Sequence, residues 1–440
     1  MTVAKFETLA DWLNYLEQLH PKTIELGLGR IGEVRRRLGI EPAFPLITVG
    51  GTNGKGSTCA MLESILHAAG YRVGCYTSPH ILDYNERVRV AKQAASDAEL
   101  CAAFEKIEAA RRMAPEISLT YFEFGTLAAM LCFIGHGVEA AILEVGLGGR
   151  LDAVNAFDAD CAVVCSVDMD HTEYLGDTRE KIAFEKAGIF RAGRVAVYAD
   201  PDMPLAIAAQ AEAVGARLWR QGKEFGYVAH ERQWDYRGPG MARVALPYPA
   251  LRGAYQLNNA SAALAALEAV QERLPVSMEA VRRGLVEVTL AGRFQVIPGR
   301  PAIILDVAHN PHAARALAQN LAAFAAAPGA GAPARTYAVF AMLRDKDMAG
   351  VARALDGRID VWLAAGIDAP RGAGADELAQ VLRDAGVRGD IHRFDTPADA
   401  LRYARNAAAE SDRIAAFGSF YTVAAVMRAL DEPGTAGIQP

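Results

Sequence analysis

Short apolar runs alternate with helical patterns along most of the chain. Pro45–Val49 is an apolar run that precedes a glycine-rich loop, and residues 58–69 then place Met61, Leu62 and Ile65 at helical spacing. Four further apolar runs predict strands: Tyr71–Tyr76, Ala140–Val145, Cys161–Val167 and Val195–Tyr198. Runs that are apolar throughout are typical of parallel strands covered by helices on both faces. We therefore expect a doubly wound α/β domain, less regular over residues 217–250.

The same alternation resumes near residue 295. The predicted strands are Ala302–Leu305, Tyr337–Ala341, Val361–Ala365, Ile391–Phe394 and Ile414–Phe417, and the predicted helices are 311–324, 347–355, 375–385, 397–409 and 421–430. Residues 325–334 form a Pro/Gly/Ala connection, and the tail from Glu432 is expected to fray. The pattern predicts two α/β domains, residues 1–294 and a Rossmann-like domain at 295–440. Two such domains favour a ligand site in the cleft between them.

Composition removes several classes of protein. The 440 residues are 52% hydrophobic and 22% charged, which indicates a folded globular chain. A net charge of −6 excludes a broad basic surface for nucleic acid. The first 20 residues are charged throughout, unlike a signal peptide, and the longest uncharged apolar stretch, residues 124–138, is too short to span a bilayer. The six cysteines lack C-x-x-C spacing and are expected to be reduced core thiols, so we expect a soluble cytoplasmic protein.

A glycine-rich loop after the first predicted strand points to nucleotide binding. Its residues are Gly51, Thr52, Asn53, Gly54, Lys55, Gly56, Ser57 and Thr58. Glycines allow backbone N–H groups to turn inward, the following helix adds positive potential, and Lys55 supplies a cation for β/γ-phosphate oxygens. The alternative is a glycine-rich turn with a surface lysine.

This loop departs from the usual G-x-x-x-x-G-K-[ST] pattern. Val49 occupies the position of the motif's first glycine, and Gly56 occupies the position of the Ser or Thr that usually supplies a hydroxyl to magnesium. The hydroxyl that meets a metal is therefore open among Ser57, Thr58 and Ser78. No N-K-x-D segment for reading guanine is present, which argues against a GTP-binding switch.

Three side chains follow predicted strands at the same sheet edge. Glu144 ends one strand, and Ser78 and His171 lie just after two others. A carboxylate at the carboxyl edge of a parallel sheet faces the crevice where ligands bind, and an oxygen ligand there suits Mg²⁺. The alternatives are an ion pair between Glu144 and Arg150 and a solvated loop position for His171.

Candidate residues also occur in the second half of the chain. Asp306 closes a predicted strand, and Asn310 is a natural helix N-cap before Pro311, so Asp306 and His309 are expected in a strand–helix loop. Asn259 lies in an alanine-rich helical segment where a buried amide would need a partner.

Nine segments in order resemble one known family. They are GTNGKGST, then YTSPHILDYNERVRV (76–90), ISLTYFEFGTLAA (117–129), ILEVGLGGRLDAVN (142–155), DHTEYLG (170–176), FEKAGIFR (184–191), GRFQV (292–296), DVAHNPHA (306–313) and GSFYTVA (418–424). Together they resemble the bacterial folylpolyglutamate synthase/dihydrofolate synthase family of the Mur-type ATP-dependent amide ligase superfamily. The blocks extend from residue 23 to residue 424.

The resemblance implies a role for each candidate residue. It implies that residues 1–294 form a Mur-type ATP- and folate-binding domain and that residues 295–440 form a C-terminal Rossmann-like ligase domain. ATP is expected at Thr52, Asn53, Gly54, Lys55, Gly56, Ser57, Asn259, Arg293 and Asp306, and Mg²⁺, in two sites, near Ser78, Glu144 and His171. The dihydropteroate pocket falls on Ile24, Glu25, Leu26 and Gly27, on Thr120, Tyr121, Phe122 and Glu123, and on Leu151, Asp152 and Ala153. Without the family, Tyr121 and Phe122 would be interpreted as core residues at a helix start.

The catalytic residues implied are Lys55, Lys186 and His309. From the residues alone Lys186 is a solvated lysine, whereas the family places a carbamylated lysine there, which would carry a negative charge toward a metal. The implied reaction is ATP-dependent attachment of L-glutamate to dihydropteroate and to tetrahydrofolates by a monomer with no nucleic-acid or membrane partner. The alternatives are a cell-wall Mur-type ligase and a nucleotide-dependent switch.

Overall fold

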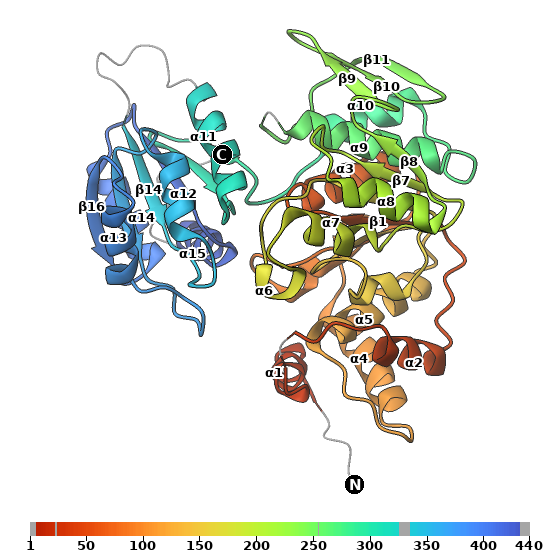
Figure 1. Cartoon of the computed structure of the whole chain (residues 1–440). Coiled ribbons are helices and arrows are strands. Elements are labelled where there is room, and N and C mark those ends of the chain that lie inside the picture. The colour runs from red at the N-terminus through yellow and green to blue at the C-terminus, as the bar shows by residue number, and fades with distance from the viewer. Residues whose placement is uncertain (1–5, 23, 254, 325–334, 432–440) are drawn as a thin grey trace. The chain divides into compact units, whose positions relative to one another are not determined.

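A computed structural model describes residues 6–22, 24–253, 255–324 and 335–431. It divides into two compact units, residues 1–250 with 257–288 and residues 251–256 with 289–440. Each unit is an α/β layer structure built on its own sheet (Figure 1). The fold class expected from the apolar runs is confirmed. The predicted connection at residues 325–334 and the tail from residue 432 lie outside the described residues.

The sheet of unit 1 has eight strands in the order β4-β3-β2-β5-β1-β6-β7-β8. In chain order these are β1 (Leu46–Gly50), β2 (Val73–Tyr76), β3 (Val88–Val90), β4 (Gln93–Ala94), β5 (Ala140–Glu144), β6 (Cys161–Val164), β7 (Val195–Tyr198) and β8 (Arg217–Arg220). The six strands β2, β5, β1, β6, β7 and β8 pair in parallel with their neighbours. At the other end of the sheet, β3 and β4 add an antiparallel edge, which was not predicted from the sequence. The five strands predicted in this region are confirmed, with ends shifted by up to three residues.

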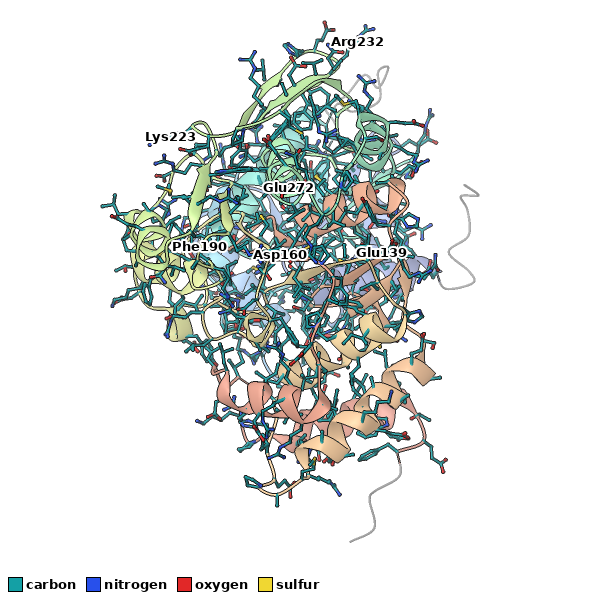
Figure 2. All side chains as sticks on the ribbon, turned by 90° about the vertical axis from the view of Figure 1, so that its right-hand side faces the viewer. Glu139, Asp160, Phe190, Lys223, Arg232 and Glu272 are labelled. Atoms are coloured by element: carbon teal, nitrogen blue, oxygen red, sulfur yellow. The ribbon has the colours of Figure 1, made fainter. Side chains whose placement is uncertain are left out.

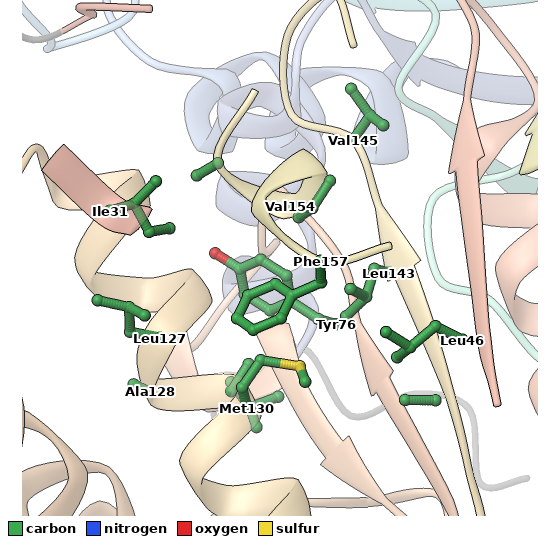
Figure 3. Close-up of a cluster of buried hydrophobic side chains, with 14 of the residues drawn as sticks. Ile31, Leu46, Tyr76, Leu127, Ala128, Met130, Leu143, Val145, Val154 and Phe157 are labelled. Carbon is green, nitrogen blue, oxygen red and sulfur yellow. The ribbon is translucent and has the colours of Figure 1, made fainter. Parts of the chain in front are cut away.

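Ten α-helices are described in unit 1 or at its boundary. They are α1 (Leu9–Leu19), α2 (Gly29–Leu38), α3 (Lys55–Ala68), α4 (Asp97–Arg111), α5 (Tyr121–Gly135), α6 (Thr172–Leu175), α7 (Arg179–Ala187), α8 (Leu205–Val214), α9 (Gln256–Ala269) and α10 (Met278–Glu287). Thr120 caps α5, its hydroxyl accepting from the N–H of Glu123 while the Glu123 carboxylate accepts from the N–H of Thr120. Leu127 and Met130 of α5 belong to the main buried cluster, in which the rings of Tyr76 and Phe157 lie between them and Leu143 of β5 (Figure 3).

The expectation of irregular structure at residues 217–250 is wrong. This segment contains β8 and a three-stranded antiparallel sheet of β9 (Gly226–Ala229), β10 (Trp234–Arg237) and β11 (Ala242–Leu246). Trp234 and Tyr236 of β10 are fully buried and alternate with more exposed neighbours. The strands are only four or five residues long and are separated by polar turns, so no apolar run marks them.

Unit 2 contains a six-stranded sheet in the order β12-β13-β17-β14-β15-β16. Its strands are β12 (Gln295–Ile297), β13 (Ala302–Asp306), β14 (Thr336–Phe340), β15 (Val361–Ala365), β16 (Asp390–Phe394) and β17 (Arg413–Phe417), and its helices are α11 (Pro311–Ala323), α12 (Met348–Leu355), α13 (Ala375–Asp384), α14 (Pro397–Ala407) and α15 (Phe420–Asp431). All strands predicted here are confirmed. The edge strand β12 is antiparallel and was not predicted.

The surface is charged, and the interior is apolar. Glu139, Lys223, Arg232 and Glu272 are exposed, whereas Phe190 is buried (Figure 2). Within the described ranges, no helix has both the length and the apolar character needed to cross a bilayer.

Close packing between α10 and α3 predicts a position that tolerates no side chain. A Cβ added at Gly284 of α10 would lie 2.5 Å from the Cα of Ile65 in α3. Gly284→Ala should therefore lower the free energy of unfolding by about 1–3 kcal/mol, because α10 must move away from α3.

The matched control is Gly32→Ala in α2, where an added Cβ meets nothing within 4 Å. Since glycine is a poor helix former, this change should raise stability by about 0.5–1 kcal/mol. Urea unfolding of both variants makes the measurement, and equal effects of the two substitutions would contradict the packing argument.

Candidate functional site

The glycine-rich loop lies between β1 and α3, as its sequence predicts. Gly51 and Gly54 adopt φ angles of +140° and +89°, which side-chain-bearing residues rarely adopt. A Cβ at Gly54 would also lie 2.5 Å from the Oδ1 of Asn259 on α9. The first N–H groups of a helix lack partners within it, so the start of α3 at Lys55 can present donors to an anion.

The segment after β6 holds this loop in shape. The N–H of Thr52 donates to the carbonyl of Ser166 (2.8 Å), and the N–H of Asn53 donates to the Ser166 hydroxyl (3.1 Å). The hydroxyl of Thr52 accepts from the N–H of Asp168 (3.0 Å). The loop conformation is therefore fixed by a neighbouring strand end.

Two lysine side chains converge on the loop. The Nζ of Lys55 donates to the carbonyl oxygens of Gly51 (3.0 Å) and Thr52 (3.2 Å), and the Nζ of Lys186 donates to the same Gly51 oxygen (3.0 Å). Lys186 is only 5% exposed, so the interpretation of a solvated lysine is wrong. Burial, together with the nearby charge of Lys55, lowers the pKa of Lys186 to about 7. A large fraction of its amine is therefore neutral and nucleophilic near neutral pH.

The order of the sheet brings the three predicted metal residues to neighbouring strand ends. Ser78 follows β2, Glu144 ends β5, and His171 follows β6, and these strands are separated only by β1. The backbone N–H of Ser78 donates to the Oε2 of Glu144 (3.1 Å). Of the other hydroxyls left open, Thr58 is fully buried with its Oγ1 3.3 Å from the Sγ of Cys165, and so faces the interior.

These residues fit a divalent cation that also takes ligands from a substrate. They offer one carboxylate, one hydroxyl and one imidazole, and Mg²⁺ typically uses one or two protein carboxylates with water and phosphate oxygens. The described residues contain no group of three or more His, Cys, Asp or Glu side chains arranged to hold a metal. The alternative pairing of Glu144 with Arg150 is not found, because Arg150 forms its ion pair with Glu185 (2.8 Å).

Three segments predicted to bind one substrate also meet. The N–H of Gly27 donates to the carbonyl of Leu151 (3.1 Å). Arg30 joins Glu25 and Glu123, with N···O distances of 3.3 and 3.2 Å. The ring of Phe122 packs against Gly146, where a Cβ would lie 2.6 Å from it. The contacts bring together Ile24–Gly27, Thr120–Glu123 and Leu151–Ala153.

The sequence analysis missed Arg30 because its role depends on two carboxylates far away in the chain. Nothing in the local pattern of α2 distinguishes this arginine from the others on that helix. Tyr121 and Phe122 are both only partly buried, which leaves ring surface available at this location. The guanidinium of Arg87 lies 5.5 Å from the Tyr121 ring centroid.

Asp152 fixes the turn between these segments and β5. Its Oδ2 accepts from the N–H of Leu147 (2.8 Å), and its Oδ1 accepts from the N–H of Val154 (3.0 Å). The side chain is nearly fully buried, and burial raises the pKa of its carboxyl to about 7.

A separate set of candidate residues gathers at the carboxyl end of β13 in unit 2. Asp306 accepts from the N–H groups of Phe294 (2.9 Å) and Ala308 (2.8 Å), and burial raises its pKa. The Nδ1 of His309 lies 2.9 Å from the carbonyl of Val307. The guanidinium of Arg293 lies 5.3 Å from the ring centroid of Phe420 at the start of α15.

Phe420 belongs to this set, although the sequence analysis gave it no role. The His309 ring centroid lies 6.3 Å from that of Phe420, so the phenyl ring lies beside both the imidazole and the guanidinium. The available signal was its place after β17, the strand beside β13. The helix predicted at 311–324 with Asn310 as its N-cap is confirmed, with the Asn310 Oδ1 accepting from the N–H of Ala313 (2.9 Å).

Comparison with known proteins gives one consistent result. A family model described as the Mur ligase middle domain matches residues 49–267, and one described as Mur ligase, glutamate ligase domain matches residues 292–420. The chain is 46% identical over 430 residues to the dihydrofolate synthase/folylpolyglutamate synthase of Escherichia coli (strain K12), covering 98% of this chain and 97% of that protein.

Solved structures agree with this similarity. E. coli FolC in complex with DHPP and ADP matches with a TM-score of 0.90 and 46% identity, over 97% of this chain and 98% of that one. A bifunctional folylpolyglutamate synthase/dihydrofolate synthase with Mn, AMPPNP and L-glutamate bound matches with a TM-score of 0.88 and 46% identity, over the same shares.

The buried carboxyl of Asp152 predicts a pH dependence of stability. Its folded pKa of about 7 lies above the value of about 3.9 expected in the unfolded chain. The folded protein therefore holds an extra proton between about pH 4 and pH 7, and the associated stability is lost as the pH rises through 7. Asp152→Asn cannot titrate, so relative to this variant wild type should lose up to about 1.4 kcal/mol per pH unit.

Urea unfolding of both proteins at pH 5, 6, 7 and 8 tests this expectation. The difference between them should change from pH 5 to 7 and level off by pH 8. Asp158→Asn, at an exposed carboxylate, is the control and should follow wild type throughout. A difference between wild type and Asp152→Asn that is constant over the whole range would contradict the assignment.

Proposed function

This chain belongs to the dihydrofolate synthase/folylpolyglutamate synthase family of Mur ligases and is an ATP-dependent glutamate ligase, and we propose that it acts on two acceptors, dihydropteroate and tetrahydrofolates. The observation that carries the proposal is the edge of the unit 1 sheet. There a glycine loop with two lysine ammonium groups lies beside a serine, a glutamate and a histidine at neighbouring strand ends. These are the groups that a phosphoryl transfer from ATP requires.

The chemistry starts from a poor acyl donor. A carboxylate would have to expel oxide, so its oxygen first attacks the γ-phosphorus of ATP, the bond to ADP breaks, and an acyl phosphate forms. The amino group of L-glutamate then attacks the acyl carbon, phosphate leaves with the bonding electron pair, and the nitrogen loses a proton. The products are an amide, ADP and phosphate.

The proposed work of the protein is mainly positioning and charge neutralisation. In unit 1, Thr52, Asn53, Gly54, Gly56 and Ser57 would hold phosphate oxygens through the loop, and Lys55 would turn from the loop carbonyls to the β/γ-phosphates. The amide of Asn259 lies against Gly54, so it supports the loop and would also meet the nucleotide.

Residues of unit 2 take part in the same reaction in this proposal. Arg293 and Asp306 would bind the nucleotide, and His309 would act near the transferred phosphoryl group. The proximity of Arg293 and His309 to the same Phe420 ring supports their roles because it places both side chains at one location.

Mg²⁺ is the proposed divalent cation, with two sites, and Ser78, Glu144 and His171 would hold it. Such an ion supplies positive charge that neutralises the phosphate oxygens during transfer. Support comes from the hard donor set of these residues and from Mn in the structure of a related enzyme.

The acceptor would bind where Ile24–Gly27, Thr120–Glu123 and Leu151–Ala153 meet. The part-buried rings of Tyr121 and Phe122 are suited to contact a flat heterocycle. We further propose that the enzyme works as a monomer in the cytoplasm, with small molecules as its only partners.

Lys186 is proposed to be carbamylated. Its neutral amine would attack the carbon of CO₂, form an N–C bond and release a proton, which leaves a carbamate with one negative charge. The low pKa of Lys186 supports this step because the unprotonated amine is the reactive form. The change also replaces the repulsion that the protonated amine of Lys186 would feel from Lys55 with an attraction.

Release of ADP tests the proposed function. Wild type should release ADP only when both L-glutamate and either dihydropteroate or tetrahydrofolate are present. Lys55→Ala should lose at least about 100-fold in rate because a phosphate-facing cation is removed, while far-UV circular dichroism stays unchanged. Faster ADP release with a muramyl precursor, or release that needs no acceptor, would overturn the assignment in favour of a cell-wall ligase or a nucleotide switch.

Substitution of Lys186 tests the carbamate. Lys186→Arg keeps a cation but cannot form the carbamate, so it should be as inactive as Lys186→Ala. Bicarbonate added to CO₂-depleted wild type should raise the rate and should leave the arginine variant unchanged. Lys181→Arg on the same helix, whose side chain is exposed and pairs with Asp177 (2.8 Å), is the control and should retain full activity.

An active Lys186→Arg variant would remove the carbamate from the mechanism. If Lys186 instead acts as a cation that contacts phosphate, arginine should be the best replacement and glutamate the worst. The ligase assignment itself would stand in that case.

A further inference from the structure

We infer that Arg89 is a positioning residue that couples the phosphate-loop helix to the serine proposed to meet the metal. The inference rests on the proposed function, because it assigns a purpose to a contact network that reaches Ser78 and Glu144. Arg89 lies on β3, opposite Cys75 of β2, and no part of the proposed chemistry uses it directly.

All five N–H groups of this guanidinium have acceptors. The Nε–H and one N–H of Nη2 donate to the carboxylate of Glu63, at 3.1 and 2.8 Å. The other N–H of Nη2 donates to the Sγ of Cys75 (3.3 Å). The two Nη1 hydrogens bond to the hydroxyl of Thr77 (3.1 Å) and the carbonyl of Glu86 (2.8 Å). A lysine could not reproduce this planar set of donors.

One side of the network ends on the nucleotide loop. Glu63 lies on α3, whose first residue is Lys55, and its side chain is only 6% exposed. Through Glu63, Arg89 fixes the position of α3 and therefore of the loop that precedes it.

The other side ends on the proposed metal residues. Thr77 directly precedes Ser78, whose N–H donates to Glu144. Glu86 holds the rest of that loop, because its carboxylate accepts the N–H groups of Ile81 (2.8 Å) and Leu82 (2.7 Å). The hydrogen bonds of Arg89, the peptide link between Thr77 and Ser78, and the bond from Ser78 therefore connect α3 to the Glu144 carboxylate.

A buried ion pair is a costly way to stabilise a fold. Charges removed from water lose much of what they gain from each other, and apolar residues of the same volume often serve equally well. The chain offers a comparison, since Arg111 and Glu108, both on α4, form a more deeply buried pair, with N···O distances of 2.6 and 2.7 Å. That pair lies within one helix, whereas the largely buried pair at Arg89 joins β3 to α3 beside the proposed ATP–metal site.

Mn²⁺ binding in the presence of AMPPNP, measured by electron paramagnetic resonance, tests the inference without turnover. Arg89→Lys should weaken Mn²⁺ binding at least about tenfold, while binding of AMPPNP without metal changes less than about threefold. Arg111→Lys is the matched control: it should lower the melting temperature by a comparable amount and leave Mn²⁺ affinity at the wild-type value.

A second variant keeps the ion pair intact. Thr77→Val removes only the hydroxyl that Arg89 reaches, and it should weaken Mn²⁺ binding several-fold without a large loss of stability. If Arg89→Lys fails to fold, Thr77→Val decides the question alone. Mn²⁺ affinity in Thr77→Val equal to wild type, or equal losses in Arg89→Lys and Arg111→Lys, would show that the network is only a structural brace. Absence of AMPPNP-dependent Mn²⁺ binding by wild type would instead count against the metal site of the proposed function.

Discussion

Two lysine side chains share one backbone oxygen in this protein, and much of unit 1 is arranged around that fact. The partly buried Lys55 and the buried Lys186 both donate to the carbonyl of Gly51, and burial together with the charge of Lys55 lowers the pKa of Lys186 to about 7. Such an arrangement is unfavourable until negative charge arrives. A nucleotide phosphate and a carbamate are two sources of that charge. The glycine conformations, the bonds from the β6 segment and the packing of α3 all hold this electrostatic imbalance in place.

Carboxylates that accept backbone N–H groups serve a different purpose elsewhere in the chain. Glu86, Asp152 and Asp306 each accept two or more backbone N–H groups within a loop. Each carboxylate fixes a turn by accepting backbone N–H groups that, in a strand or helix, would donate to backbone carbonyls. Protein stability and the geometry of the candidate sites therefore depend on the same few acidic side chains.

The sequence predicts the parts of this molecule whose signals are local. Apolar runs such as Val195–Tyr198 mark strands because parallel strands are buried on both faces, and the glycines of residues 51–56 mark the loop because their backbone angles allow little else. Parallel pairing then implies that Ser78, Glu144 and His171 share an edge. Arg30, Arg89 and Phe420 could not be found in this way, since each acts through partners distant in the chain. The burial of Lys186 was hidden for the same reason: its charge on an amphipathic helix looks like a solvated position.

The contact between Gly54 and Asn259 has a consequence for how such a chain can change. An atom added to residue 54 would occupy the space that the Asn259 amide already fills, although one residue lies in the loop and the other on α9. The two positions therefore cannot be substituted independently. A larger residue at position 54 requires that Asn259 be replaced by a smaller residue first. The order of mutational steps is thus constrained: a route through residue 259 first would pass through a protein with a loosened loop, and a route through residue 54 first would pass through a clash. Epistasis of this kind confines exploration of the loop to paths that begin on a helix far along the sequence.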